Sequence, residues 1–347
     1  MKPIGTAIIG YGFSGSTFHS PFLKTMEEFE VVCVLSSNEE KVKKNLPDTD
    51  VEQAIDEVIK RDDVELIVVT TPSSLHFDIT KKALQAGKHI VLEKPMVPTS
   101  KEAEELTACA REHGVMLSVF QNRRYDGNFL TVKKLIDEGK LGDIYFYEAH
   151  YDRFEPAVAK GWREENKPAS GVLYDLGAHL IDQALALFGM PDSITADIQK
   201  QRPEAIVDDY FHLILTYGTK RVTLHSSMLS FEQGSKYKVH GSQGTFMKKG
   251  EDPQEAELLA GSLPDGPDWG MDSIDQYGTL YTSSGSEKIV TLPGDYRHYY
   301  REVYECIRNG KPCSVAGEDG IKTARIIEAA LESSREKRTI ELFKKLR

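Results

Sequence analysis

The feature that most constrains the fold is the stretch IIGYGFSG near the start of the chain. It places Gly10, Gly12 and Gly15 in the spacing G-x-G-x-x-G directly after an apolar run. The first glycine permits a tight turn, the second lets the backbone approach a pyrophosphate, and the third lets a helix pack closely on a sheet. The alternative is a glycine-rich turn that binds no ligand, so the surrounding pattern has to decide between them.

Apolar, β-branched runs alternate with amphipathic segments through the first third of the chain. This alternation is typical of a parallel sheet covered by helices on both faces. We expect strands at residues 6–10, 29–37, 64–76, 89–95 and 115–124, and helices at 15–26, 50–61, 77–87 and 100–114. The glycine motif then connects the first strand to the first helix. The pattern predicts a dinucleotide-binding Rossmann domain over residues 1–122.

The pattern changes after residue 122, where most segments alternate as antiparallel strands do. Residues 209–218 and 221–231 are expected to form a hairpin, and residues 236–249 a second one. The polar stretch 248–270 is interpreted as an excursion from the sheet. We expect a second α+β domain over residues 123–347, with a large, mostly antiparallel open sheet. A C-terminal helix at about 318–335 is expected to pack back on the Rossmann domain.

Charge and composition exclude several classes of partner. The formal net charge is −11, which argues against a nucleic-acid or anionic membrane surface. No apolar run is long enough to cross a bilayer, and no secretory signal is evident. Four scattered cysteines show no metal spacing, so no metal site is expected and a cytoplasmic location is favoured. The second sheet has too few helices to cover both faces, which predicts a homodimer or homotetramer.

The end of the second strand predicts the cofactor. An NAD-preferring domain usually carries an acidic residue there, but this chain has Ser36 and Ser37, followed by Lys41. Hydroxyls and an ammonium group favour the extra phosphate of NADP, with NAD as the alternative. Glu39 and Glu40 are expected to point outward from the next helix.

Two further motifs carry candidate catalytic groups. The stretch VLEKP places Lys94 at the end of a parallel strand, where open α/β sheets bind ligands; the alternative is a surface lysine. The stretch LYDLGAHLID places Asp175, His179 and Asp182 on about one side of a helix, and the alternative is an ion-pair or capping pattern.

Together, GYGFSG, TTPSSLH, EKPM and LYDLGAHLID resemble the Gfo/Idh/MocA oxidoreductases, which include glucose–fructose oxidoreductase and inositol dehydrogenases. The likeness is nearest to the NADP-dependent scyllo-inositol dehydrogenase branch of that family. The resemblance implies hydride transfer between a nicotinamide and a secondary hydroxyl of a cyclic polyol or sugar. It also implies that Lys94, Asp175 and His179 are the catalytic residues. Either His179 or Lys94 takes the proton, and we favour His179.

Other residues are expected near the cofactor or substrate. The expected cofactor contacts also include Phe13, Thr71, Pro72, His76, Glu93, Asn122, Trp162 and Arg163. The expected substrate contacts are Tyr151, Arg153 and His298. Two other functions stay open, namely a nucleotide-binding regulator or sensor without turnover, and an aldose or dihydrodiol dehydrogenase.

Overall fold

The computed structural model describes residues 2–159, 161 and 164–343. The chain divides into two compact units, and each is described by itself. The first comprises residues 1–122, 254–269 and 295–321, and the second comprises residues 123–253, 270–294 and 322–347.

The first unit contains a six-stranded parallel sheet in the order β3-β2-β1-β4-β5-β6. Its strands are β1 Ile4–Ile9, β2 Phe29–Leu35, β3 Asp50–Glu52, β4 Leu66–Val69, β5 His89–Leu92 and β6 Leu117–Val119. Every residue of β1 and β4 is buried, as expected for central strands covered on both faces. This order is the one that doubly wound dinucleotide-binding domains use.

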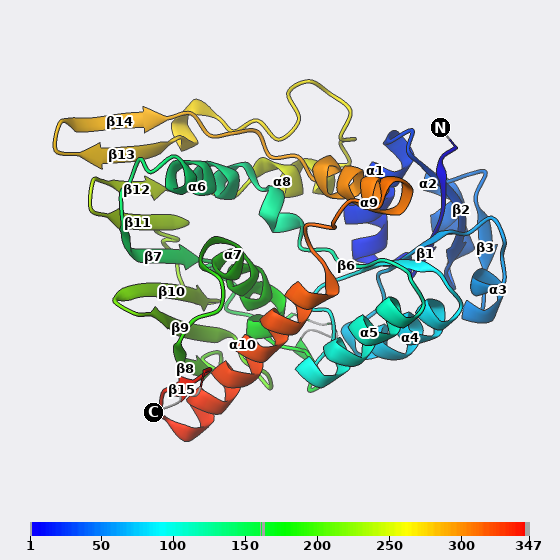
Figure 1. Ribbon diagram of the computed structural model, residues 1–347, viewed down its shortest axis with the longest axis horizontal. Helices are drawn as coiled ribbons and strands as arrows, with labels where there is room; N and C mark the ends of the chain where they lie inside the picture. Colours follow the sequence, from blue (N-terminus) through cyan, green and yellow to red (C-terminus); the bar gives the residue numbers. More distant parts are fainter. Residues whose placement is uncertain (1, 160, 162–163, 344–347) are drawn as a thin grey trace. The chain divides into compact units, whose positions relative to one another are not determined.

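Helices cover both faces of this sheet (Figure 1). Helices α4 and α5 lie on one face, and α1 and α9 lie on the other. The helical segments are η1 Gly15–His19, α1 Ser20–Thr25, α2 Glu39–Asn45, α3 Ile55–Ile59, η2 Ser73–Leu75, α4 His76–Gln85, α5 Ser100–Glu112 and α9 Arg297–Asn309.

The expectation of a single helix over residues 50–61 is wrong. Residues Asp50–Glu52 form the edge strand β3, which pairs in parallel with the end of β2. The helix α3 starts only after Ala54, where the Glu57 carboxylate accepts hydrogen bonds from the backbone N–H groups of Gln53 and Ala54 at 3.2 and 3.0 Å. Strand pairing therefore overrides the helical spacing of the first residues.

The polar stretch after residue 248 leaves the sheet of the second unit, as expected, and forms structure of its own. It contains the helix α8 Pro253–Leu259, and residues 254–269 belong to the first unit. The Nε1–H of Trp269 donates to Gln254 Oε1 at 3.0 Å, and the Trp269 ring packs against Phe22 of α1. This segment joins the core of the first unit through its aromatic ring.

The second unit is built on a nine-stranded sheet in the order β14-β13-β12-β11-β7-β10-β9-β8-β15. Only the pairing of β7 with β10 is parallel. The strands are β7 Ile144–His150, β8 Ser193–Gln199, β9 Tyr210–Tyr217, β10 Lys220–Ser227, β11 Tyr237–Gly241, β12 Thr245–Lys248, β13 Gly278–Thr282, β14 Gly285–Ile289 and β15 Ile340–Glu341. Both expected hairpins, β9–β10 and β11–β12, are confirmed.

One face of this second sheet forms the core of the unit (Figure 1). The core strands supply residues such as Tyr147, Phe211 and Leu224, which pack with buried residues of three helices. The helical segments are η3 Asn122–Tyr125, α6 Gly127–Asp137, η5 Leu173–Gly177, α7 Ala178–Phe188, η6 Ile274–Gln276 and α10 Gly317–Glu336. Alternate strand residues point to the opposite face of the sheet.

The C-terminal helix α10 has residues in both units. Residues 317–321 belong to the first unit, where a Cβ atom on Gly320 would meet the Met96 sulfur and would lie 3.1 Å from Val119 Cγ2. Ile326 and Ile327, further along the helix, are buried in the core of the second unit. The packing of the rest of this helix on the Rossmann domain stays a prediction.

Candidate active site

The glycine loop follows β1 at the carboxyl end of the parallel sheet. Gly10 has φ +91, a backbone conformation that favours glycine. A Cβ atom on Gly15 would lie 2.8 Å from Thr70 Oγ1 and would also clash with the Gly10 carbonyl oxygen, so the helix packs closely only because no side chain is present. A Cβ on Gly12 would meet no atom within 4 Å. The backbone at Gly12 is thus open to a ligand, as a pyrophosphate requires.

Polar and apolar groups around the loop fit a dinucleotide. Within the described part of the chain, Thr71 Oγ1 after β4 and Gln121 Oε1 after β6 are buried without a hydrogen-bond partner. Phe13 is 50% exposed and Leu75 is 47% exposed. Unpaired buried oxygens are costly, so a ligand that donates to them would be stabilised there. The carboxyl edge of the first sheet therefore offers what a nicotinamide dinucleotide needs.

Ser36 and Lys41 lie at the end of β2 and in α2. The Ser36 hydroxyl is buried and accepts from the N–H of Asn38 at 3.1 Å, whereas Ser37 is exposed. Lys41 Nζ donates to the carbonyl oxygens of Tyr11 and Gly12, both at 3.0 Å. The ammonium group of Lys41 therefore lies directly beside the glycine loop.

Glu93 is a buried connection between the glycine-loop helix and the EKP turn. Its carboxylate accepts hydrogen bonds from Ser14 Oγ and from the N–H of Lys94, and lies 3.1 Å from His19 Nε2. Burial raises the pKa of Glu93, but hydrogen bonding and charge attraction from His19 outweigh burial and lower it to about 2. The Glu93 carboxylate is thus already occupied by Ser14, His19 and Lys94. It holds the glycine loop and the EKP turn in position.

His76 connects the loops after β4 and β5. One ring nitrogen lies 2.9 Å from the Thr71 carbonyl oxygen, and the other lies 3.1 Å from those of Pro95 and Met96. The ring is buried, and burial lowers its pKa. Pro72 beside it is exposed.

Lys94 and Asn122 occupy the neighbouring strand ends. Lys94 is half-buried directly after β5. Asn122 is 6% exposed and follows β6 by three residues. Both residues therefore follow strand ends at the same carboxyl edge as the glycine motif, where an open parallel sheet binds its ligands.

Asp175 and His179 lie on one continuous helical segment of the second unit. Asp175 belongs to the π-helical turn η5 and is half-buried, and His179 is the second residue of α7 and is 5% exposed. Asp182, one turn further, forms a bidentate ion pair with Arg124 at 2.7 and 2.6 Å. The ion-pair interpretation is therefore correct for Asp182.

Asp208 holds the start of that segment in place, although no motif in the sequence predicts this role. Its Oδ2 accepts from the N–H of Leu173 at 2.7 Å, and its carbonyl oxygen accepts from the N–H of Val172 at 2.9 Å. Burial raises the pKa of Asp208 to about 6. This side chain positions the helical turn on which Asp175 lies.

Tyr151 lies in a buried basic environment. The Arg123 guanidinium lies 5.7 Å from the centre of the Tyr151 ring, and the Lys236 ammonium also lies over the ring. Lys236 is paired with Glu251 at 3.1 Å, and burial lowers its pKa to about 8. Nothing in the strand-like sequence around Lys236 marks it, so sequence reasoning missed this residue.

The other predicted contacts are more dispersed. Arg153 is half-buried beyond β7, with its guanidinium 3.7 Å from the Glu155 carboxylate. His298, in the first turn of α9, has a side chain that is 53% exposed. Trp162 and Arg163 lie outside the described residues.

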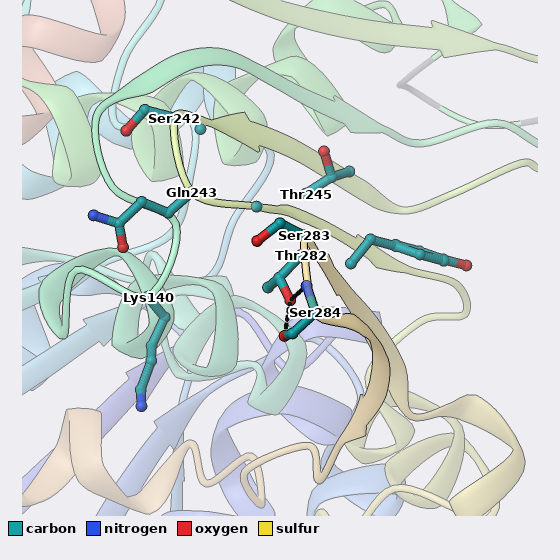
Figure 2. A pocket seen from close by; sticks show the side chains of 10 residues that line it. Lys140, Ser242, Gln243, Thr245, Thr282, Ser283 and Ser284 are labelled. Carbon is teal, nitrogen blue, oxygen red and sulfur yellow. Dashed lines mark hydrogen bonds between the residues drawn. The ribbon is translucent and has the colours of Figure 1, made fainter.

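A polar hollow in the second unit is lined by none of these residues (Figure 2). It is lined by the turns of the β11–β12 and β13–β14 hairpins and by Lys140. Two of its hydroxyls, Thr282 Oγ1 and Ser284 Oγ, lie 2.8 Å apart and are hydrogen-bonded. Lys140 is the one ionisable group among its lining residues besides Tyr281, so the hollow lacks an acid–base pair. Separately, no helix in the described ranges is long and apolar enough to cross a membrane.

Comparisons with known proteins identify the family to which both domains belong. Residues 4–121 match the oxidoreductase-family model for an NAD-binding Rossmann fold, and residues 133–342 match the model for the C-terminal alpha/beta domain of the same family. The chain is 47% identical over 346 residues to scyllo-inositol 2-dehydrogenase (NADP(+)) IolW of Bacillus subtilis (strain 168), covering 99% of this chain and 97% of that one. It is 27% identical to inositol 2-dehydrogenase of Rhizobium meliloti (strain 1021), with 84% of each chain covered. The structure of yvaA from Bacillus subtilis superposes with a TM-score of 0.96 at 46% identity, covering 99% of each chain.

The fold and its glycine-loop edge therefore define an oxidoreductase that uses a nicotinamide dinucleotide. The chain belongs to the Gfo/Idh/MocA oxidoreductase family. The family resemblance, the fold class and the nicotinamide cofactor expected from the sequence are confirmed.

Proposed function

We propose that the protein is an NADP-dependent dehydrogenase of a secondary hydroxyl on a cyclic polyol, with scyllo-inositol as the first substrate to test. The relative IolW, whose name states this activity, supports the substrate class at 47% identity over nearly the whole chain. The observation that carries the NADP preference is the end of β2. There Ser36 and Ser37 replace an acidic residue, and the Lys41 ammonium lies beside the glycine loop.

Each candidate residue has a distinct role in the proposed reaction. A bound nicotinamide supplies the hydride chemistry. His179 accepts the proton of the substrate hydroxyl, because an imidazole exchanges protons near neutral pH. Lys94 stabilises the developing alkoxide with its charge, and Asp175 binds a neighbouring hydroxyl. Gly10, Gly12 and Gly15 hold the pyrophosphate through the backbone, with Phe13 against the cofactor.

The test is a panel of inositols, aldoses and dihydrodiols, each assayed for hydride transfer with NADP and with NAD. We expect turnover with scyllo-inositol and a higher kcat/KM with NADP by roughly tenfold or more. Turnover with an aldose or dihydrodiol alone would identify another substrate class. Tight NADP binding without turnover on any member would favour a regulator or sensor instead.

We further propose that the protein is a homo-oligomer, assembled through the open face of the second sheet. This face carries Phe146, Ile214, Met247 and Tyr281, and Ile214 and Tyr281 are 37% and 46% exposed. Exposed apolar area of this kind favours a symmetric interface. Light scattering at micromolar concentration should give a dimer or tetramer, and Ile214→Arg should weaken it. A monomeric wild-type protein would refute the proposal.

A cytoplasmic location is also proposed. Cys33, Cys109, Cys306 and Cys313 are all free thiols, which suits a reducing compartment. Cell fractionation with an antibody against the protein tests this location, and recovery outside the cytoplasm would contradict it.

A further inference from the structure

Three histidines form a row across the open face of the second sheet. His225 of β10 is paired in register with His212 of β9 on one side and with His150 of β7 on the other. The neighbouring residues Leu224, Leu213 and Ala149 belong to the core, so the histidines point to the opposite face. Asp152 follows His150 by two residues and lies beside the row.

The Asp152 carboxylate lies between two of these imidazoles. Its Oδ2 is 3.1 Å from His150 Nδ1, and its Oδ1 is 2.9 Å from His225 Nδ1. One ligand atom from each of the three side chains lies within 4.8 Å of the others. Around a tetrahedral ion with bonds of about 2.0–2.1 Å, ligand atoms are about 3.4 Å apart. The three groups therefore need only small side-chain movements to meet at one ion.

We propose that His150, Asp152 and His225 form a site for a divalent transition-metal ion, with Zn²⁺ as the ion to test first. Two imidazole nitrogens and one carboxylate oxygen are ligands that zinc accepts, and a water fills the fourth position. The site lies on the sheet of the second unit and involves none of the residues proposed for catalysis. None of the comparisons assigns it.

The surroundings of these ligands resemble the outer shell of a metal site. His150 Nε2, the nitrogen away from Asp152, lies 3.3 Å from Glu148 Oε1, and a ligating histidine usually donates its second N–H to a carboxylate. Asp152 Oδ1 accepts from the N–H of Ser227 at 2.9 Å, which fixes the carboxylate. His225 Nδ1 is buried and lies 2.9 Å from Asp152 Oδ1, without a well-aligned hydrogen bond. A metal ion between these two atoms would use the lone pairs of both.

The experiment is a Zn²⁺ titration of the untagged, chelator-treated protein against a chromophoric chelator, with Co²⁺ absorption as a second probe. We expect one ion per chain, and we expect Asp152→Asn and His225→Gln to weaken binding by at least about tenfold. Glu148→Gln should weaken binding less. His240→Gln is the matched control, because His240 lies on the same face and pairs instead with Thr245 at 2.8 Å.

Thermal unfolding with and without Zn²⁺ provides a second measurement of binding. It compares the Tm of the wild type with that of the variants. Zn²⁺ should raise the Tm of the wild-type protein and of His240→Gln, but not that of Asp152→Asn. If Asp152→Asn does not fold, His150→Gln replaces it. Absence of stoichiometric Zn²⁺ and Co²⁺ binding, or equal binding by the wild type and the ligand variants, would overturn the proposal.

Discussion

The carboxylate of Glu93 and the imidazole of His19 meet 3.1 Å apart in the interior of the first unit. His19 lies in the helical segment after the glycine loop, and Glu93 precedes Lys94 in the loop after β5. His19 Nδ1 in turn contacts the Tyr300 hydroxyl of α9 at 2.6 Å. The loop that would hold the pyrophosphate and the loop that carries Lys94 are therefore fixed to each other by one buried carboxylate.

We predict that Glu93→Gln destabilises the fold and weakens NADP binding. The pKa of Glu93 in the folded protein, about 2, is below its ordinary value of 4.5. The carboxylate thus stabilises the fold by about 3 kcal/mol above pH 4.5, and this is lost as the pH falls from about 4.5 towards 2. Urea unfolding between pH 3 and 7 should show a steeper loss of stability towards low pH in the wild type than in Glu93→Gln. Glu39→Gln, an exposed change in α2, should retain it.

Lys41→Ala should reduce the preference for NADP over NAD. Its ammonium is beside the glycine loop, where it adds a positive charge for the extra phosphate of NADP. Loss of one charged contact should lower the NADP-to-NAD ratio of kcat/KM by roughly tenfold. Lys44→Ala is the matched control, since Lys44 is exposed at the end of the same helix. Equal cofactor ratios in Lys41→Ala and the wild type would contradict the assignment.

Two substitutions at Asp208 should have different effects. The pKa of Asp208 is about 6, above its ordinary value of 3.8, so ionisation of this buried group destabilises the fold as the pH rises from about 4 to 6. Asp208→Asn keeps an oxygen that accepts from the Leu173 N–H and should remove that loss of stability. Asp208→Ala loses the hydrogen bond from the Leu173 N–H, costs about 1 kcal/mol, and should lower kcat by displacing the turn that carries Asp175. If Ala and Asn gave the same kcat, the positioning role would be wrong.

Asp182→Ala should lower the free energy of unfolding far more than it lowers kcat. Its removal leaves the Arg124 guanidinium, which is only 14% exposed, without its bidentate partner. The free energy of unfolding should fall by roughly 3–5 kcal/mol, whereas the kcat of the folded fraction should fall far less than in His179→Ala. Urea unfolding and active-site titration measure the two effects separately.

The parallel sheet and the glycine loop could be predicted from the sequence because their physics is local. The buried β-branched runs of β1 and β4 permit only strands covered on both faces, and Gly10 and Gly15 are required by the turn and by close packing. Edge strand β3 was mistaken for part of a helix because its identity depends on pairing with β2, which no local spacing reveals.

The roles of individual side chains were harder to predict, because they depend on residues distant in the chain. The sequence places Asp182 on the same side of the helix as Asp175 and His179, but its ion pair with Arg124 depends on a residue 58 positions away. Asp208 and Lys236 carry no motif, and only burial and partners distinguish them from ordinary surface charges. The His150–Asp152–His225 cluster joins the ends of β7 and β10. These strands are paired in the sheet but lie far apart in the chain, so no local motif reveals the cluster.

We propose that His179 accepts the proton and that Lys94 stabilises the alkoxide when a polyol hydroxyl is oxidised by hydride transfer. The most direct test is the single-turnover rate of NADP reduction in Lys94→Ala and His179→Ala, with NADP affinity measured in parallel. Lys101→Ala, an exposed lysine in α5, serves as the control. We predict that both site variants lose roughly two to four orders of magnitude in rate while NADP still binds and the control is unchanged. Near-normal rates in both variants on a substrate that the wild type turns over would contradict the account.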